Sequence, residues 1–360
     1  MAATTHPEFS ENTEAIEVAE AFPSEIRGKT IMVTGVNRGG IGFPTSQAFA
    51  SQSPSMLIIV GRDPCKVQQS IDDLKAAFPD VHYRGLKVDL SSQQSVRDAA
   101  ATVISWKDIP AIDIVINSAG IMGIQERTLS KDGIELHFAT NHLGYWLLAC
   151  LIMPKLIRAA ELNPKGATRI INVSAASPQV SGMRWSDINF EKRNKDLPLE
   201  EQPDYQWFAM CGCPNIKEES FVPLDAYNRS KVANVLFSIA ANNRLFYKYG
   251  ILSVSLHPGV IETELGRNMS REDQETFAKL RQSVFKPRTL GAGASTSLVA
   301  ALDPELAQGV GERKGDSENW GSYLDNCQIS GKAHPLAVSN DEAEKLWGLS
   351  ESLAKQAFEW

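Results

Sequence analysis

The sequence has few cysteines and no excess of positive charge. The five cysteines are odd in number and scattered, at Cys65, Cys150, Cys211, Cys213 and Cys327. This usage argues against a disulfide framework and for a reducing compartment, so we expect a cytoplasmic protein. The chain has 36 Lys and Arg against 43 Asp and Glu, a net charge of −7. That balance gives no electrostatic reason to expect nucleic acid or an anionic membrane as a partner.

Long apolar runs and targeting signals are also missing. Residues 1–22 have no cationic start and no long apolar stretch, so we expect no signal peptide. No window approaches the ~20 apolar residues of a membrane helix, and we expect no membrane span. Cys211 and Cys213 lack a matching second pair, so we interpret them as loop thiols and expect no metal.

Short apolar runs do alternate with helix-like segments from about residue 28 onward. Most of these runs are apolar throughout, which is typical of a parallel sheet covered on both faces. The pattern predicts an α/β fold, a Rossmann-like doubly wound parallel sheet with helices on both faces. We expect one dinucleotide-binding domain over 28–360, after an N-terminal arm over 1–27 and ending in a helical tail over 340–360. The expected strands are 29–35, 56–60, 83–90, 112–120, 168–174 and 251–259, and the expected helices are 42–52, 65–78, 92–106, 134–160 and 226–248.

The alternation breaks once, over residues 177–225. This stretch is rich in proline and charge. So long a connection inside a compact domain is usually a lid, a binding loop or a disordered segment. Its aromatic residues favour a folded, lid-like insertion, and they are Trp185, Tyr205, Trp207, Phe208 and Phe221.

A glycine-rich turn, "TGVNRGGIG" (34–42), joins the first expected strand to the first helix. Glycines allow the tight turn, and the N-terminus of the following helix offers free N–H groups and a positive dipole end to phosphate. We therefore predict a dinucleotide site here. Its predicted contacts are Gly35, Asn37, Arg38, Gly40, Ile41 and Gly42.

The end of the second expected strand favours NADP(H) over NAD(H). A site for NAD usually has a carboxylate here to hold the ribose 2′-hydroxyl. This sequence has Gly61 instead, followed by Arg62, which can pair bidentately with a 2′-phosphate. Arg38, in the glycine-rich turn, is a second candidate phosphate partner. The alternative is that both arginines are solvated surface residues.

The segment "YNRSK" places Tyr227 and Lys231 four residues apart on an expected helix, so both project from one face. A phenol with a pKa of ~10 is a poor acid at neutral pH unless a nearby cation stabilises the phenolate. Lys231 can supply that cation. On its own the spacing is weak evidence, because two unrelated surface residues often show it.

Together with motifs elsewhere, this pair resembles the short-chain dehydrogenase/reductase family. The resemblance covers about residues 28–330, in family order, and the branch is similar to retinol dehydrogenases, WW-domain oxidoreductases and protochlorophyllide reductases. Beyond the glycine-rich turn and Tyr227 with Lys231, the matching motifs are "VDL" (Asp89, Leu90), "NSAG" (Asn117, Ala119, Gly120), "TNHLG" (Asn141) and "HPGVIET" (Pro258, Gly259, Val260, Thr263).

The resemblance implies an NADPH-dependent reductase of a carbonyl group. Hydride would come from NADPH, and Tyr227 would protonate the developing alkoxide. Lys231 would lower the pKa of the tyrosine and hold the nicotinamide ribose. Asn141 would organise a water beside Lys231, and Thr263 would contact the carboxamide. Family members often pair through two long helices, here 134–160 and 226–248, so a homodimer is also implied unless the C-terminal tail blocks that pairing.

Two small departures from the family pattern fall in the cofactor motifs. The glycine-rich turn has four residues between Gly35 and Gly40, where the family usually has three. Gly39 therefore looks like an inserted glycine, which is tolerable because glycine adapts to any φ. Asn117 is followed by Ser118 where the family has a second asparagine.

A larger departure falls in "RIINVSAASP" (169–178). The catalytic serine of the family is the second serine of N-V-S-S, and Ala175 stands at that place. Side chains alternate along a strand, so Ser174 should face the opposite side, whereas Ser177 has the right parity and Pro178 should keep it extended. Two residues span ~6.6 Å, too far for Ser177 to make the same hydrogen bond unless the chain bends. A donor from the insertion or a hydroxyl of the substrate is a further alternative.

The substrate should lie under residues 264–290, with the insertion over the same mouth. Large side chains near these segments favour a bulky apolar or aromatic small molecule. The alternative is that they only form a small core of the insertion. The residues concerned are Tyr145, Trp146, Met183, Trp185, Trp207 and Phe208.

Three functions stay open. The first is the carbonyl reductase. The second is a non-redox isomerase, dehydratase or cyclase that keeps the cofactor and uses Tyr227 and Lys231 as an acid/base pair. The third is a regulatory module that binds NADPH without turnover. Ala175 favours the second and third, whereas the combined presence of Tyr227, Lys231 and Asn141 argues against the third.

Overall fold

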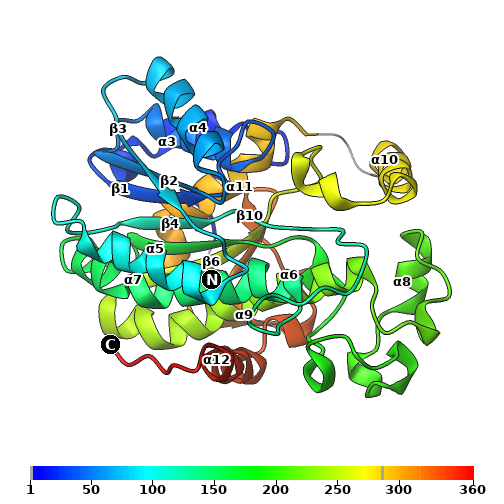
Figure 1. Cartoon of the computed structure of the whole chain (residues 1–360). Coiled ribbons are helices and arrows are strands. Elements are labelled where there is room, and N and C mark those ends of the chain that lie inside the picture. Colours follow the sequence, from blue (N-terminus) through cyan, green and yellow to red (C-terminus); the bar gives the residue numbers. More distant parts are fainter. Residues whose placement is uncertain (1–2, 285–287, 316) are drawn as a thin grey trace.

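A computed structural model describes residues 3–284, 288–315 and 317–360 (Figure 1). Its central sheet has eight strands in the order β10-β9-β6-β5-β4-β1-β2-β3, all parallel except β10. The predicted doubly wound parallel sheet is confirmed. The strands of this sheet are β1 (Thr30–Thr34), β2 (Met56–Gly61), β3 (His82–Lys87), β4 (Ile114–Asn117), β5 (Thr168–Val173), β6 (Ile251–His257), β9 (Tyr323–Asp325) and β10 (Gln328–Ile329).

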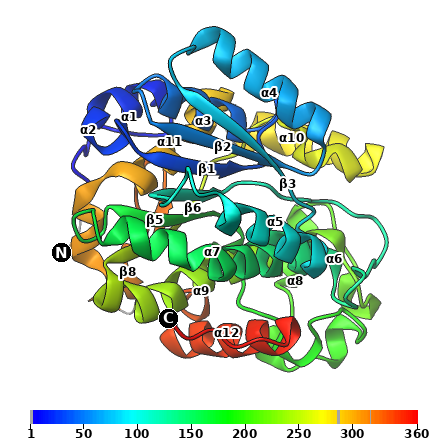
Figure 2. The same cartoon turned by 60° about the vertical axis from the view of Figure 1, so that its left-hand side comes forward.

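Helices cover both faces of the sheet (Figures 1 and 2). Alternate residues of one strand serve the two faces, as the pleat requires. In β1, Ile31 and Val33 pack in one core, and Met32 packs in the other. The first core includes α1 (Ala15–Ala21), α3 (Gly42–Ala50), α4 (Pro64–Ala77) and α11 (Leu290–Leu302), and the second includes α5 (Gln93–Ser105), α7 (Gly144–Ala160), α9 (Pro223–Tyr249) and α12 (Asn340–Ala354).

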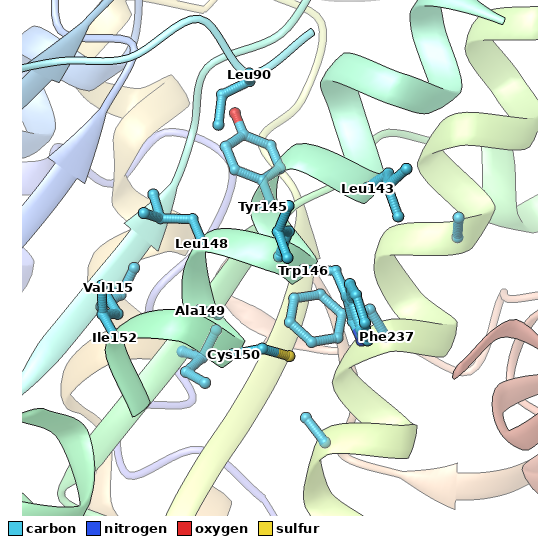
Figure 3. Packing of buried hydrophobic residues seen from close by; sticks show 14 of the residues in the cluster. Leu90, Val115, Leu143, Tyr145, Trp146, Leu148, Ala149, Cys150, Ile152 and Phe237 are labelled. Carbon is cyan, nitrogen blue, oxygen red and sulfur yellow. The ribbon is translucent and has the colours of Figure 1, made fainter. Parts of the chain in front are cut away.

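The expected helix 134–160 is interrupted in the structure. It begins as α6 (Leu136–Phe138), passes through a π-helical turn at Ala139–Leu143, and continues as α7. By length and composition Leu136–Ala160 would pass as a membrane span, contrary to the sequence expectation. However, 72% of its most apolar window is buried inside the protein. Figure 3 shows Trp146 of α7 facing Phe237 of α9 in this core. The helix therefore serves as a core helix here.

The chain after β6 contains strands that the sequence analysis does not predict. β9 pairs with β6, β10 turns back against β9, and β7 (Glu312–Lys314) pairs with β8 (Ser317–Trp320) as a separate hairpin. These strands have only two to four residues. Such short segments carry no long apolar run, which is why the periodicity missed them.

Both ends of the chain pack against the domain. In the N-terminal arm, Val18 and Ala19 are fully buried, and α1 packs on α3 and α11. At the other end, α12 packs along α9, with the Trp347 ring edge-on to Trp146 of α7 (5.4 Å between centroids). Figures 1 and 2 both show α12 outside α9. A second copy could meet α7 and α9 at this place only after α12 had moved.

Candidate functional site

A cleft of about 780 Å³ lies at the carboxyl ends of the parallel strands. Its wall includes the ends of β1 and β4, where the strand order reverses. Ligands of open α/β sheets bind at such a reversal point. Tyr227 is not among the described residues that line the cleft. From the expected adenosine end to the expected nicotinamide end, the predicted residues that do line it include Gly35, Asn37, Gly40, Ile41, Gly42, Arg62, Asp89, Leu90, Ala119, Gly120, Ser174, Lys231, Pro258, Gly259 and Thr263.

The glycine-rich turn packs closely against the end of β4. Gly35 has φ of +72°, and a Cβ there would lie 2.7 Å from the Ala119 nitrogen. A Cβ on Gly42 would lie 2.7 Å from the Gly35 carbonyl oxygen. Thr34 Oγ1 accepts hydrogen bonds from the Ser118 and Ala119 N–H groups, at 2.9 and 3.1 Å. Only glycine fits at positions 35 and 42, and the turn presents its backbone to the cleft.

Buried polar atoms in this part of the cleft fit a polar ligand. Asn37 Oδ1, Ser118 Oγ and Thr140 Oγ1 are buried and have no hydrogen-bond partner among the residues that the structure describes. All three residues line the cleft. Buried polar groups are normally paired, so these atoms and the glycine cradle suit a phosphorylated dinucleotide.

The inserted Gly39 has a structural role. A Cβ there would lie 2.7 Å from Glu264 Cγ, and the Glu264 N–H donates to the Gly39 carbonyl oxygen at 2.9 Å. Glu264 follows Thr263 in the segment that closes the nicotinamide end. The extra glycine therefore makes room for this segment to cross the turn.

Of the two arginines predicted to contact a 2′-phosphate, only Arg62, at the end of β2, lies in the cleft. Arg62 lines the cleft, and a Cβ on Gly61 would lie only 2.8 Å from Val67 Cγ2, so a side chain at 61 would be crowded. Arg38 instead forms a two-bond ion pair with Asp73 of α4, at 2.5 Å for both contacts. It is absent from the described residues that line the cleft.

Two lysines join Arg62 at this end of the cleft, Lys66 and Lys87. The sequence analysis missed both. Lys66 lies in the first turn of α4, directly after the strand end that carries Arg62, and both residues line the cleft.

Asn117 does not reach the cleft. Its side chain is 1% exposed and donates to Asn172 Oδ1 at 2.8 Å. Asn172 in turn donates to Ser238 and Ser253. The prediction that Asn117 contacts the cofactor is therefore wrong for its side chain, which ties β4 to β5 inside the domain. Val260 is likewise absent from the described lining residues.

Tyr227 and Lys231 lie together near the N-terminus of α9. Tyr227 is 7% and Lys231 3% exposed, and Lys231 Nζ lies 5.7 Å from the centre of the Tyr227 ring. Lys231 Nζ donates to the Val173 carbonyl oxygen at the end of β5, at 2.8 Å. Burial raises the pKa of the Tyr227 phenol and lowers the pKa of Lys231 to about 7. An added anion beside Lys231 would favour its charged form.

Asn141 lies in the π-helical turn, and both ends of its side-chain amide are hydrogen-bonded. Asn141 Nδ2 donates to the Ile121 carbonyl oxygen and to Ser230 Oγ, both at 3.0 Å, and its Oδ1 accepts from the Ile121 N–H at 2.9 Å. These bonds fix the loop after β4 beside Lys231. The side chain therefore has a positioning role, and the water that the resemblance implies beside Lys231 stays a prediction.

The serines beside Ala175 are committed to α9. Ser174 Oγ donates to the Lys231 carbonyl oxygen at 2.6 Å, and Ser177 Oγ donates to Asn228 Oδ1 at 2.7 Å. Ser177 lies in a 3₁₀ turn (Ser177–Gln179), so the expectation that Pro178 keeps it extended is wrong. Pro178 is the second residue of this turn, where its fixed φ fits a helical conformation. The chain bends here, but the bend carries Ser177 toward α9.

The large side chains expected around the substrate mostly pack in cores. Tyr145 and Trp146 are fully buried in the domain core, and Met183 is 2% exposed there. Phe208 forms a small core of the insertion, with Trp207 packed against it. The side chains that line the cleft instead include Ile124, Leu136, Leu265, Arg267 and Asn268.

The expected covering segment 264–290 forms a short 3₁₀ helix at Glu264–Asn268 and α10 (Arg271–Val284). Gln125, which follows Ile124 of the cleft wall, donates to Asp273 of α10 at 3.2 Å. Residues 285–287 of this segment lie outside the described residues.

Known proteins are similar to this chain in sequence and fold. A family model described as "short chain dehydrogenase" matches residues 29–187. The chain is 36% identical to oxidoreductase fscI of Fusarium equiseti over 251 residues, which cover 70% of this chain and 94% of that protein. It is 31% identical to human retinol dehydrogenase 13 over 341 residues, which cover 92% and 87% of the two chains.

Solved structures agree on the fold. An NADPH-bound carbonyl reductase from chicken fatty liver superposes with a TM-score of 0.52 at 21% identity, over 83% of this chain and 96% of the reductase. At that identity the likeness concerns the fold alone. The relatives over most of the chain, and the glycine-rich cleft that reaches Lys231 with Tyr227 beside it, confirm the resemblance. This chain belongs to the short-chain dehydrogenase/reductase family of oxidoreductases, which use a nicotinamide cofactor.

Proposed function

We propose that this chain is an NADPH-dependent reductase of a ketone, aldehyde or quinone-like carbonyl on a bulky hydrophobic small molecule. One observation carries the proposal. A cleft of dinucleotide size runs from the glycine-rich turn to Lys231, whose ammonium lies 5.7 Å from the ring of a buried tyrosine. Such a phenol–ammonium pair can deliver a proton where negative charge develops on an oxygen.

The charges at the adenosine end support NADPH rather than NADH. Arg62, Lys66 and Lys87 gather there, and Gly61 offers no carboxylate. The carboxylate of Asp63 is engaged with the N–H of Cys65 at the start of α4, at 2.9 Å. The chicken carbonyl reductase with this fold is an NADPH complex. When bound, the reduced nicotinamide would supply hydride to the carbonyl carbon.

Residues of this chain would supply the proton and the cation that makes its transfer favourable. Tyr227 would donate its phenolic proton to the carbonyl oxygen, and the Lys231 ammonium would stabilise the resulting phenolate. The Val173 carbonyl oxygen holds Lys231 Nζ in place for this task. Thr263 and Gly259 line the end of the cleft where the carboxamide would lie.

Ala175 makes the proposed reductase slow or dependent on its substrate. The usual serine would donate a second hydrogen bond to the carbonyl oxygen, and the hydroxyls of Ser174 and Ser177 already bond to α9. Loss of one preorganised donor typically costs ~10²–10³ in turnover. The same observation favours the second candidate, a non-redox acid/base reaction in which the cofactor is retained unchanged.

A panel of aromatic ketones and quinones, with NADPH absorbance and product both followed, separates these functions. For the reductase we expect Tyr227→Phe to lower kcat by about 10²–10⁴-fold and to leave NADPH affinity within about twofold, since only the proton donor is lost. Tyr205→Phe, on the insertion, is the matched control and should keep full activity. Product without loss of NADPH would contradict the reductase and support the second candidate; binding with neither change would support a regulatory module.

Ala175→Ser tests the missing donor. If the carbonyl oxygen lacks this hydrogen bond, restoring the hydroxyl should raise kcat at least tenfold. The variant is compared with wild type in single-turnover reduction of the best substrate of the panel. An unchanged rate would contradict the account of Ala175, because another donor would then already occupy the place.

Arg62→Ala tests the cofactor. A hydrogen bond to a charged group contributes ~1.5–3 kcal/mol, so the Kd for NADPH should rise about 10–100-fold while the Kd for NADH stays within about twofold. Arg38→Ala is the matched control, because Asp73 holds Arg38 away from the cleft. Fluorescence titration gives both constants. Equal loss of both cofactors, or a larger loss in Arg38→Ala, would contradict the assignment.

The pH dependence tests Lys231. Burial lowers the pKa of Lys231 to about 7, so the free enzyme loses this cation as the pH rises through 7. For the wild type, kcat/KM for NADPH should therefore fall above about pH 7. In Lys231→Arg, whose guanidinium stays charged, that fall should disappear up to pH 9. A wild-type profile that is flat from pH 6 to 9 would contradict this role.

A further inference from the structure

Helix α9 is buried on two opposite faces near its N-terminus. Tyr227 and Lys231 lie on one face, four residues apart. Asp225 and Arg229 are also four apart, and each is two residues from Tyr227, about 200° around the helix axis. All four residues are at most 7% exposed. The turn that carries the proposed acid therefore has an ionic pair directly behind it.

Arg229 joins this turn to the insertion 177–225. Its Nε donates to Asp225 Oδ1 at 2.9 Å. Its two terminal nitrogens donate to the carbonyl oxygens of Gly182 and Glu201, at 2.8 and 2.9 Å. These carbonyls lie 19 positions apart in the insertion, so one guanidinium fixes α9 to both an early and a middle part of it. A planar guanidinium holds three such directions at once, which an ammonium cannot do.

A second buried arginine organises the insertion itself. Arg184 is fully buried and donates to Asp187 Oδ2 at 2.7 Å and to Asn194 Oδ1 at 2.6 Å. Its Nη1 lies 3.8 Å from Asp225 Oδ2, so it also faces the pair on α9. The guanidinium stacks over the Phe190 ring at 4.4 Å. Two arginines and two aspartates thus form one buried network that spans the insertion and α9.

The network fixes the insertion against α9, although no described residue of 177–225 lines the cleft. Buried ion pairs add little net stability but require one geometry, because each charge depends on its partner. The catalytic face of the same turn is held separately, by Ser174 and Val173 at the end of β5. Any shift of the insertion would therefore act on the N-terminal turn of α9 through Arg229.

We propose that Arg229, with Asp225 and Arg184 behind it, is a positioning residue that sets the place of Tyr227 from the opposite face of α9. This inference rests on the proposed function of Tyr227 as the proton donor. Arg229 is not among the described residues that line the cleft. Its effect is therefore on the placement of Tyr227 and not on the binding of the cofactor. A shift of about 1 Å in a reacting group can cost 10²-fold in rate.

The test is Arg229→Lys, which keeps the positive charge but loses the planar guanidinium and its three hydrogen-bond directions. We expect kcat to fall 10–100-fold while the Kd for NADPH stays within twofold and the thermal midpoint stays well above the assay temperature. Arg193→Lys is the matched control, an arginine of the same insertion that is 53% exposed and paired with Asp196; it should keep wild-type kcat. Asp225→Asn, which weakens the same pair, should reproduce the kcat loss if Arg229→Lys does not fold.

Hydrogen exchange gives a readout that does not need turnover. In wild type, the amide hydrogens of 223–231 and of 182–194 should exchange at similar rates. In Arg229→Lys, those of 182–194 should exchange faster than those of 223–231. Wild-type kcat in a folded Arg229→Lys, or a fall in kcat matched by an equal loss of NADPH binding, would overturn the proposal. If wild type reduces no substrate, the proposed function fails, and unchanged exchange in the variant would still refute the network separately.

Discussion

The attachment of α9 to the end of β5 is the constraint on which the site depends. Lys231 Nζ and Asn234 Nδ2 both donate to the Val173 carbonyl oxygen, at 2.8 and 3.2 Å, and Ser174 Oγ donates back to the Lys231 carbonyl oxygen at 2.6 Å. Val173 is the last residue of strand β5, and its buried carbonyl oxygen needs hydrogen-bond partners. The lysine and the asparagine satisfy it, and the same bonds place Lys231 in the cleft.

The remaining elements build outward from that joint. The π-helical turn brings Asn141 against Ser230 of α9 and the loop after β4, so the Tyr227 turn is fixed on one side by the neighbouring helix. The insertion fixes it on the other side through Arg229. On the opposite side of the cleft, the Glu264 N–H donates to the Gly39 carbonyl oxygen and joins the segment at Glu264 to the glycine-rich turn. The polar groups around α9 are thus mostly used in holding it.

Sequence could predict the features that depend on local patterns. The apolar runs of β1, β2, β5 and β6 predicted the sheet, and the glycine-rich turn and the Tyr227–Lys231 spacing predicted where its cleft lies. The strands of two to four residues after β6 carry no such pattern, and they were missed. The direction in which a side chain points could not be predicted either. Asn117 and Arg38 belong to recognisable motifs and Tyr145 follows one, but contacts with residues distant in sequence decide that they pair elsewhere.

The central claim is that the Tyr227 phenol lies beside the reactive ring of a bound phosphorylated dinucleotide. A crystal structure of the protein with NADP⁺ measures this directly. The account predicts the 2′-phosphate at Arg62 and the Tyr227 hydroxyl about 3–4 Å from the place of a reacting oxygen above the nicotinamide. A nicotinamide ring turned away from Tyr227, or a dinucleotide bound outside the cleft, would contradict it.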